Sequence, residues 1–315
     1  MRAFLFPGQG SQSVGMGAAL AVASQAARDT FGEGDEALGQ NLFKLMREGP
    51  EDDLKLSENA QPAIMAHALA VFRALTREGG VSLEKVAHFV AGHSLGEYSA
   101  LCAAGSFDLP TTAKLLKLRG QAMQRAVPVG QGAMASLIGP KTDLALAEAA
   151  AQAGSEAGVC VVANDNNQGN IVISGEKAAV DKAIEAAKGM GARAVPLNVS
   201  APFHCPLMQP AAEEMAEALA AATVLAPRTP LVANVTARPT NDPELIRRLL
   251  VEQVTGRVRW RESVTWMVEE GGVTRFAEAG AGKVLSGMVK RIAPDAEAVP
   301  LNTPADLEAA AKILG

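Results

Sequence analysis

The sequence predicts an α/β fold, in which a mostly parallel sheet carries helices on both faces and a small second domain is inserted. Two observations lead to this class. Apolar, strand-like runs alternate with helical patterns nearly throughout, as is typical of parallel sheets. One block, residues 128–198, instead has the pattern β-α-β-β-α-β of a ferredoxin-like unit. At 315 residues the chain is long enough for both.

The predicted elements follow from these patterns. In the larger domain, strand-like runs cover residues 2–6, 86–91, 230–235 and 273–279, and helical patterns cover 61–77 and 206–222. In the inserted block, strands are expected at 134–139, 158–164, 170–175 and 192–198, and helices at 142–154 and 176–190. We therefore place a large domain at 1–127 and 199–315 and a small subdomain at 128–198, with the substrate in the cleft between them.

Composition argues against several partners and locations. Aromatic residues make up 4% of the chain, and the net charge is −5, so neither nucleic acid nor an anionic membrane is expected as the main partner. Cys102, Cys160 and Cys205 lie far apart and suggest neither a disulfide framework nor a metal site. The apolar run at the N-terminus is too short for a signal peptide. We expect a cytoplasmic protein without a metal.

A glycine-rich turn, PGQGSQSVGMG, follows the first strand and raises the question of a phosphate site. A dinucleotide GxGxxG motif would need glycine where Ser13 or Leu20 stands, and no Walker lysine follows. The later GAGKVLS also fails as a Walker motif, since Ala277 replaces its first glycine and Val284 follows the lysine. A nucleotide-binding module is therefore disfavoured.

The strongest motif is Gly92-His93-Ser94-Leu95-Gly96, a GxSxG that follows an apolar strand and precedes a helical pattern. A serine on so sharp a strand-to-helix turn holds a strained backbone, and its neighbours two residues away must lack Cβ. The turn lifts the hydroxyl out of the sheet, and the N–H groups that follow it can hold an oxyanion. Ser94 is thus the predicted nucleophile.

A serine nucleophile needs a base, and the chain has four histidines. His67 lies on an apolar helical pattern, His88 lies near the start of the preceding strand, and the His93 side chain must point away from that of Ser94. His204 remains, in a Pro-bracketed loop between a strand and a helix, where bases occur in α/β enzymes. Cys205 beside it lacks an activating turn, so we interpret it as a packing residue.

Arg119 lies on the apolar stripe of the helical segment 111–127, at helical spacing from Leu115 and Met123. A buried guanidinium needs a partner. From periodicity alone, a structural ion pair with a carboxylate of the protein is slightly favoured. The alternative is that Arg119 grips a carboxylate of the substrate in two places.

Six segments, taken together and in order, resemble the malonyl-CoA:acyl carrier protein transacylases of type II fatty acid synthesis. The similarity runs from Phe4 to about residue 292, in the segments PGQGSQ, GHSLGEYSA, LRGQAM, NVSAPFH, EQVTGRVRW and EAGAGKVLSGMVKRI. The resemblance implies an α/β-hydrolase-like parallel-sheet domain with a ferredoxin-like insertion, in agreement with the pattern above.

The resemblance also implies roles for individual residues. Ser94 would take the malonyl group, His204 would act as general base and acid, and Arg119 would hold the malonyl carboxylate. The backbone N–H groups of Gln9 and Leu95 would form the oxyanion hole. The glycine-rich turn would then bring a backbone amide to a transition-state oxygen rather than to a phosphate.

Three further positions match the family, and a fourth residue, Phe203, is singled out by its size. Gln253 matches the residue whose main-chain carbonyl orients the histidine, which would explain why no acidic third triad member stands out. Met123 matches a position beside the acyl group, and Asn164 one near the cleft wall. Phe203 is bulky and precedes the histidine, so it should crowd a substituent on the malonyl α-carbon and favour malonyl over methylmalonyl.

The implied reaction is a ping-pong transfer of malonyl from malonyl-CoA to the pantetheine thiol of acyl carrier protein. Coenzyme A enters as a substrate thioester, no cofactor is implied, and we expect a monomer. The alternative is a serine esterase or thioesterase, in which water resolves the same acyl-enzyme. Arg119 and the ferredoxin-like insertion favour the transferase.

Overall fold

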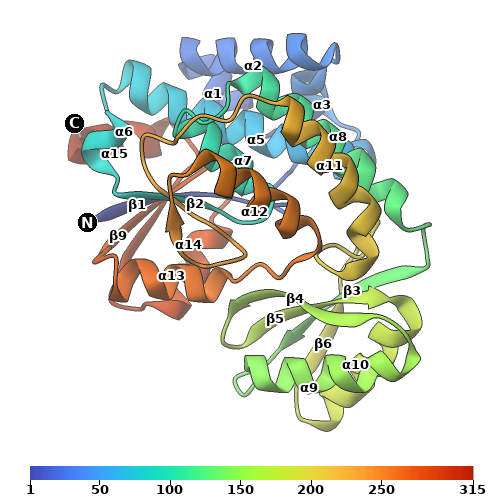
Figure 1. The fold of residues 1–315 in the computed structure, drawn as a ribbon. Helices are drawn as coiled ribbons and strands as arrows, with labels where there is room; N and C mark the ends of the chain where they lie inside the picture. The colour runs from blue at the N-terminus through green and yellow to red at the C-terminus, as the bar shows by residue number, and fades with distance from the viewer. Residues whose placement is uncertain (315) are drawn as a thin grey trace.

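The computed structural model describes residues 1–314 and contains two sheets (Figure 1). The large sheet has the order β10-β9-β1-β2-β7-β8, and only the last pair is antiparallel. Its strands are β1 (Arg2–Phe6), β2 (Phe89–Gly92), β7 (Leu231–Val232), β8 (Pro239–Thr240), β9 (Arg275–Ala279) and β10 (Glu297–Leu301). The predicted α/β class is confirmed.

Helices cover both faces of the large sheet, because successive side chains of a strand point to opposite sides. Phe4 and Phe6 of β1 pack into the cluster formed with α5 and α8, whereas Ala3 and Leu5 pack against α13 and α14. Figure 1 shows α5 and α8 on one side of the sheet and α13 on the other. This double cover explains why β1 is an almost unbroken apolar run.

The helices that precede the second sheet are α1 (Ala18–Ala23), α2 (Gln25–Leu38), α3 (Leu42–Glu48), α4 (Glu51–Lys55), α5 (Ser57–Arg73), α6 (Leu83–Val86), α7 (Gly96–Ala103) and α8 (Leu109–Ala126). A π-helical turn, η1 (Ala74–Glu78), extends α5. Those that follow it are α11 (Gln209–Ala221), α12 (Pro243–Thr255), α13 (Trp260–Glu269), α14 (Val284–Ile292) and α15 (Pro304–Leu314). A short 3-10 turn, η3 (Pro206–Met208), precedes α11.

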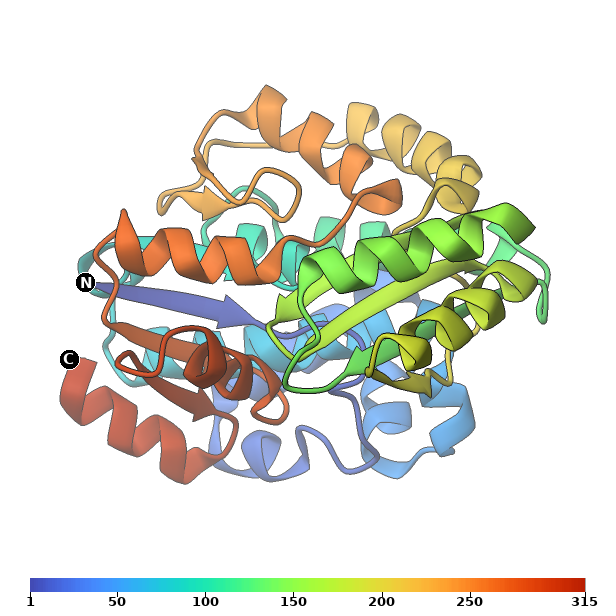
Figure 2. The same cartoon turned by 90° about the horizontal axis from the view of Figure 1, so that it is seen from below.

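The second sheet is antiparallel and has the order β4-β5-β3-β6. Its elements are β3 (Gly132–Ile138), α9 (Leu144–Gly154), the 3-10 turn η2 (Ser155–Ala157), β4 (Cys160–Asn167), β5 (Asn170–Glu176), α10 (Lys177–Gly189) and β6 (Arg193–Pro196). Helices α9 and α10 lie side by side over one face of this sheet (Figure 2). This is the strand and helix order expected of a ferredoxin-like unit. The boundaries at 127/128 and 198/199 remain our proposal.

The other face of the small sheet joins the main core, where Met134, Ala163 and Val172 pack into the same cluster as α8. An ion pair crosses this junction: the Arg261 guanidinium of α13 donates to both oxygens of Asp165, whose side chain is fully buried, at 2.7 to 3.1 Å. The shared apolar cluster and this ion pair thus hold the small subdomain against the large one.

Four predicted strands are shorter in the structure, among them 273–279, which begins at Arg275, and 192–198, which is a strand only from Arg193 to Pro196. The run 86–91 forms a strand only from Phe89, because Val86 ends helix α6. The run 230–235 pairs only at Leu231 and Val232, since the backbone N–H of Asn234 donates to the Glu97 carboxylate instead of to a strand. Within residues 1–314, no helix combines the length and apolar character needed to span a bilayer.

Candidate active site

Ser94 lies on the sharp turn between β2 and α7 and holds a positive φ of 53°. The two glycines of the motif make this turn sterically possible. A Cβ on Gly92 would lie 1.9 Å from the carbonyl of Gly96, and a Cβ on Gly96 would lie 2.2 Å from the Phe6 carbonyl oxygen. Both contacts are far inside van der Waals distance, so larger residues would unfold the turn.

The Ser94 hydroxyl meets His204, with Oγ 2.8 Å from Nε2. His204 is buried in the loop before η3 and also holds a positive φ, of 56°. Its Nδ1 lies 2.8 Å from the main-chain carbonyl oxygen of Gln253, which can only accept a hydrogen bond. Nδ1 therefore carries the proton, and Nε2 is free to accept the proton of the serine.

Burial, together with the positive charge of Arg119, lowers the pKa of His204 from its usual value to about 3. The His204 side chain is thus uncharged at neutral pH when no substrate is bound. Neutral imidazole is the form that can act as a base toward the Ser94 hydroxyl.

Arg119 extends from α8 to the nucleophile and is 1% exposed. Its Nη1 donates to Gln61 Oε1 at 2.9 Å, and its Nη2 donates to Gln253 Oε1 at 2.9 Å and to Ser94 Oγ at 3.2 Å. The direct structural ion pair that periodicity favoured is wrong: among residues 1–314, Arg119 makes no salt bridge within 4.0 Å, and its Nε has no hydrogen-bond partner. The nearest negative charge, that of Glu97, acts on it at longer range. The helix instead presents a buried, unpaired cation to the serine.

Leu95 follows the serine directly, and Gln9 lies on the glycine-rich loop whose Gly8 approaches the turn at His93. In the part of the chain that the structure describes, the N–H groups of these two residues donate no hydrogen bond. Gly8 explains how the Gln9 segment comes so close to the turn, because a Cβ there would lie 2.6 Å from the His93 carbonyl oxygen. Two unpaired donors are what an oxyanion site requires.

Three further residues predicted at the site, Met123, Phe203 and Asn164, are all buried. Met123 is 1% exposed and accepts a weak contact from Gln61 Nε2 to its sulfur at 3.8 Å, which places it beside the Arg119 side chain. Phe203 is buried directly before His204. Asn164 lies on β4, where its backbone bridges to Val258 at the junction of the two domains.

The remaining histidines do not reach the Ser94 hydroxyl. His93 points the other way, toward Asn166 of the small sheet at 2.9 Å and the Trp260 ring. His67 is buried in α5, and burial lowers its pKa to about 4. His88 is exposed. Cys205 is buried, and its thiol donates to the Pro202 carbonyl oxygen at 3.0 Å, as a packing residue does.

Sequence reasoning missed three polar residues around the site. Gln61, Glu97 and Asn234 are each at most 1% exposed, and each contacts a residue of the predicted site. A signal was present, because each is a polar residue within a run of small or apolar ones. Glu97 also stands only three residues after the nucleophile, inside the quoted GHSLGEYSA segment.

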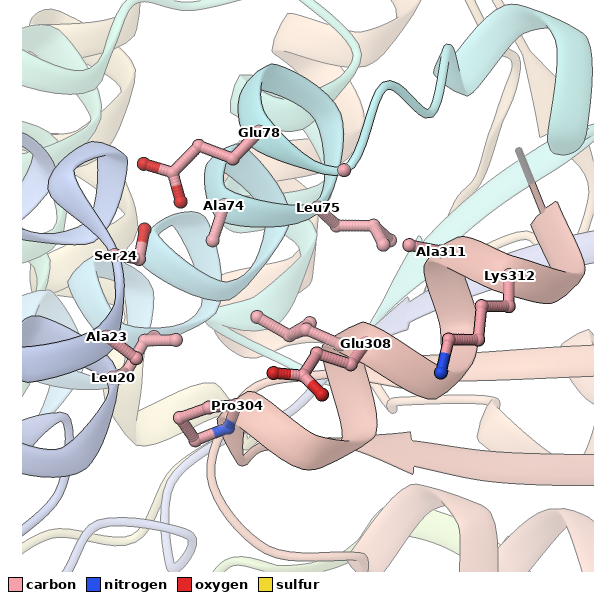
Figure 3. A pocket seen from close by; sticks show the side chains of 12 residues that line it. Leu20, Ala23, Ser24, Ala74, Leu75, Glu78, Pro304, Glu308, Ala311 and Lys312 are labelled. Carbon is pink, nitrogen blue, oxygen red and sulfur yellow. The ribbon is translucent and has the colours of Figure 1, made fainter.

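A cavity of about 540 Å³ lies elsewhere, between α1, η1 and α15 (Figure 3). Apolar side chains such as Leu20 and Leu75 line it, with Glu78 and Glu308 among the polar ones (Figure 3). None of the predicted site residues contributes to this cavity. The chemistry of the site therefore comes from the GxSxG turn and not from this pocket.

Known proteins are similar along the whole chain. Residues 3–302 match the family described as the acyl transferase domain. The malonyl CoA-acyl carrier protein transacylase of Escherichia coli K12 is 43% identical over 99% of both chains, and that of Bacillus subtilis strain 168 is 42% identical over 99% of this chain and 96% of the relative.

Solved structures are similar to the same extent. The acyl-carrier-protein-S-malonyltransferase of Bartonella henselae has a TM-score of 0.96 at 53% identity, covering 100% of this chain and 99% of that one. A malonyl-transacylase in complex with a type II PKS acyl-carrier protein has a TM-score of 0.95 at 40% identity, covering 99% of each chain.

Proposed function

The chain belongs to the malonyl CoA-acyl carrier protein transacylases of the acyl transferase family, and we propose that Ser94, His204 and Arg119 carry its reaction. The reaction moves a malonyl group from malonyl-CoA to acyl carrier protein and so supplies fatty acid synthesis. One observation carries the assignment of residues. The Ser94 hydroxyl lies between an imidazole base at 2.8 Å and a buried, unpaired guanidinium at 3.2 Å.

In the first half-reaction, Ser94 Oγ attacks the thioester carbonyl carbon while its proton passes to His204 Nε2. The carbonyl oxygen becomes an oxyanion, which the N–H groups of Gln9 and Leu95 stabilise. Each such donor lowers the barrier by roughly 3 kcal/mol. The carbon–sulfur bond then breaks, and coenzyme A leaves with the proton from His204.

In the second half-reaction, the pantetheine thiol of acyl carrier protein attacks the malonyl-serine ester. His204 takes the thiol proton and returns it to Ser94 Oγ as the ester bond breaks, so the enzyme is regenerated. The Gln253 carbonyl keeps the imidazole in one tautomer and one orientation throughout, because it holds Nδ1–H at 2.8 Å.

Arg119 selects the acyl group. A guanidinium so deeply buried, with an unpartnered Nε and no carboxylate neighbour within residues 1–314, favours an anion that the substrate brings. The free carboxylate of malonyl meets this need and can accept two parallel hydrogen bonds. We place Met123 and Phe203 against the acyl chain and Asn164 at the wall of the cleft.

The carrier itself is acidic in this class of proteins, so we expect it to dock on local basic residues. Lys283, Lys290 and Arg291 are exposed around helix α14 and are our candidates. Reversal of these charges should raise KM for the carrier and leave acylation by malonyl-CoA unchanged. An unchanged KM for the carrier would show that the carrier does not dock on these residues. We also propose that the enzyme acts as a monomer, which light scattering would test.

Labelled malonyl-CoA separates the transferase from the esterase alternative. With acyl carrier protein present, we expect label to move from the enzyme to the carrier thiol. Rapid release as free malonate, with none on the carrier, would instead assign a hydrolase. A Ser94→Ala chain should acquire no label with or without acyl carrier protein. That result would show that the activity depends on the serine of the GxSxG turn.

A further inference from the structure

Glu97 is a buried carboxylate that the reaction above does not use. It lies on α7, three residues after the nucleophile, and is 1% exposed. One carboxylate oxygen, Oε1, accepts the backbone N–H of Asn234 at 3.1 Å, and the other, Oε2, accepts the side-chain amide of Gln253. Both contacts come from elements far away in the sequence, so the Glu97 side chain connects three segments around the serine.

The Gln253 side chain bridges two buried charges. Its Nε2 donates to Glu97 and to the Ser94 carbonyl oxygen at 2.9 Å, while its Oε1 accepts from Arg119 at 2.9 Å. An anion on one side and a cation on the other permit only one orientation of this amide. The same residue presents the main-chain carbonyl that holds His204, so fixing the Gln253 side chain also fixes the base.

Asn234 is the second partner of Glu97 and acts on the nucleophile turn. Its Oδ1 accepts the backbone N–H of Ser94 at 2.8 Å, and its Nδ2 donates to the Gly92 carbonyl oxygen at 2.7 Å. The strained turn therefore receives two of its hydrogen bonds from Asn234, whose own backbone N–H donates to Glu97. The side chains of Glu97, Gln253 and Asn234 all have hydrogen-bond partners, which makes this part of the network rigid.

We propose that Glu97 is a positioning residue for acyl transfer, whose carboxylate holds the Gln253 and Asn234 supports of the base and the nucleophile. This inference rests on the proposed function. Glu97 also supplies the nearby negative charge for Arg119 through the Gln253 amide instead of by direct contact. The guanidinium is thereby stabilised and yet left free for the carboxylate of the substrate.

The role requires an unprotonated carboxylate, because both of its oxygens face donors and neither faces an acceptor. The charged or titratable groups that interact with it are Arg119 and Tyr98, and His204 lies beyond Gln253, whose carbonyl it contacts. Burial raises the pKa of Glu97 to about 7, although its hydrogen bonds and Arg119 oppose this shift. Glu97→Gln keeps the shape but sets one amide N–H against the Gln253 N–H, which breaks one of the two contacts.

Single-turnover acylation by malonyl-CoA, followed by intact mass after rapid quenching, tests the role. We expect Glu97→Gln to lower the maximal rate of Ser94 malonylation about 10- to 100-fold, through misalignment alone. The half-saturating concentration of malonyl-CoA should not rise, because Arg119 remains, and the final extent of labelling should stay near one group per chain. Glu97→Asp retains two acceptor oxygens and should recover part of the rate.

Glu278→Gln is the matched control. Glu278 is also fully buried and also accepts two N–H groups, from Leu285 and Ser286, but it supports α14 and not the serine. Its variant should acylate at the wild-type rate. The inference is overturned if Glu97→Gln acylates within about twofold of wild type, if it loses no more rate than Glu278→Gln, or if Glu97→Asp is no faster than Glu97→Gln.

A pH profile adds a readout that a merely structural role would not move. The wild-type acylation rate should fall as the pH decreases through about 7, because protonated Glu97 cannot accept both N–H groups. The slower Glu97→Gln chain should not show this loss of rate at low pH. If its acylation rate falls below about pH 7 as that of the wild type does, Glu97 is not the group responsible. A wild-type chain that is not malonylated at all would contradict the proposed function itself, whereas a malonylated wild type with an equally fast Glu97→Gln contradicts this inference alone.

Discussion

Ser94 and His204 share an uncommon backbone conformation, with φ angles of 53° and 56°, and their side chains meet at 2.8 Å. Positive φ is costly for residues with a Cβ and persists where the surroundings enforce it. Both members of the pair are thus held by the fold and not by their local sequence preference. The proposed reaction depends on this contact between the two side chains and on the groups that hold both residues in place.

The glycine at the start of the turn should be irreplaceable. Gly92→Ala places a Cβ 1.9 Å from backbone atoms of Gly96, so the turn must distort. We expect acylation to fall by about 100-fold or more, since misplacement by about 1 Å is that costly. Gly32→Ala is the control, because nothing lies within 4 Å of a Cβ there, in an exposed position of α2. It should stabilise the chain by roughly 0.5–1 kcal/mol and leave acylation unchanged.

The guanidinium should decide which acyl groups are accepted. Arg119→Ala removes the partner of the malonyl carboxylate, and we expect kcat/KM for malonyl-CoA to fall about 100-fold, since such a charged pair contributes about 3 kcal/mol. Transfer of acetyl, which carries no charge, should be spared or improved. Steady-state rates with both thioesters test this selectivity. Normal malonyl transfer by the variant would show that the arginine has only a structural role.

The residue before the base should discriminate against a branched extender unit. Phe203 is bulky and buried beside His204, so we expect a higher kcat/KM for malonyl-CoA than for methylmalonyl-CoA. Phe203→Ala should reduce this ratio by about tenfold, which is the usual effect of one methyl group in a pocket. Competition between the two thioesters measures the ratio directly. If the wild-type chain has equal kcat/KM values for malonyl-CoA and methylmalonyl-CoA, Phe203 does not discriminate between them.

Acid should destabilise the fold partly through a histidine outside the site. Burial lowers the pKa of His67 to about 4, below its ordinary value of 6.5, so the unfolded chain binds the proton more readily. The stability from the neutral side chain is present above pH 6.5 and is lost as the pH falls toward 4. The loss from this group should reach about 2 kcal/mol near pH 5.

Urea unfolding at about pH 7.5 and 5 tests this dependence. His67→Leu removes the titrating group, so its free energy of unfolding should fall less between the two pH values than that of the wild type. A variant at the exposed His88 serves as control and should follow the wild type. If the His67→Leu chain loses as much stability as the wild type, the acid sensitivity lies elsewhere.

Much of the site could be predicted from the sequence because its residues carry local signals. Ser94 lies in a GxSxG motif, which is typical of a sharp strand-to-helix turn. His204 is left when the other histidines are excluded. Arg119 is a charged residue on an otherwise apolar helix stripe. The signals for Ser94 and Arg119 each arise within about ten residues of chain, whereas His204 required a comparison of all four histidines. The two sheets were predictable for the same reason, since the periodicity of their strands and helices is local.

The supports of the site could not be predicted in this way. Glu97, Asn234 and Gln61 obtain their partners only when distant segments pack together, and no local pattern states which donor meets which acceptor. The shortened strand at Leu231–Val232 has the same cause, because Asn234 uses its backbone N–H on Glu97. The direct ion pair expected for Arg119 was wrong because its guanidinium donates to the amide oxygens of Gln61 and Gln253 and not to a carboxylate.

The central claim is that the Ser94 hydroxyl, activated by His204, becomes malonylated. Intact mass after brief exposure to malonyl-CoA tests it most directly, with Ser94→Ala and His204→Ala measured alongside. The account predicts one malonyl group on the wild-type chain, located on Ser94 by peptide mapping, none on Ser94→Ala, and greatly slowed labelling of His204→Ala. An unmodified wild-type chain, or a label that Ser94→Ala still acquires, would contradict it.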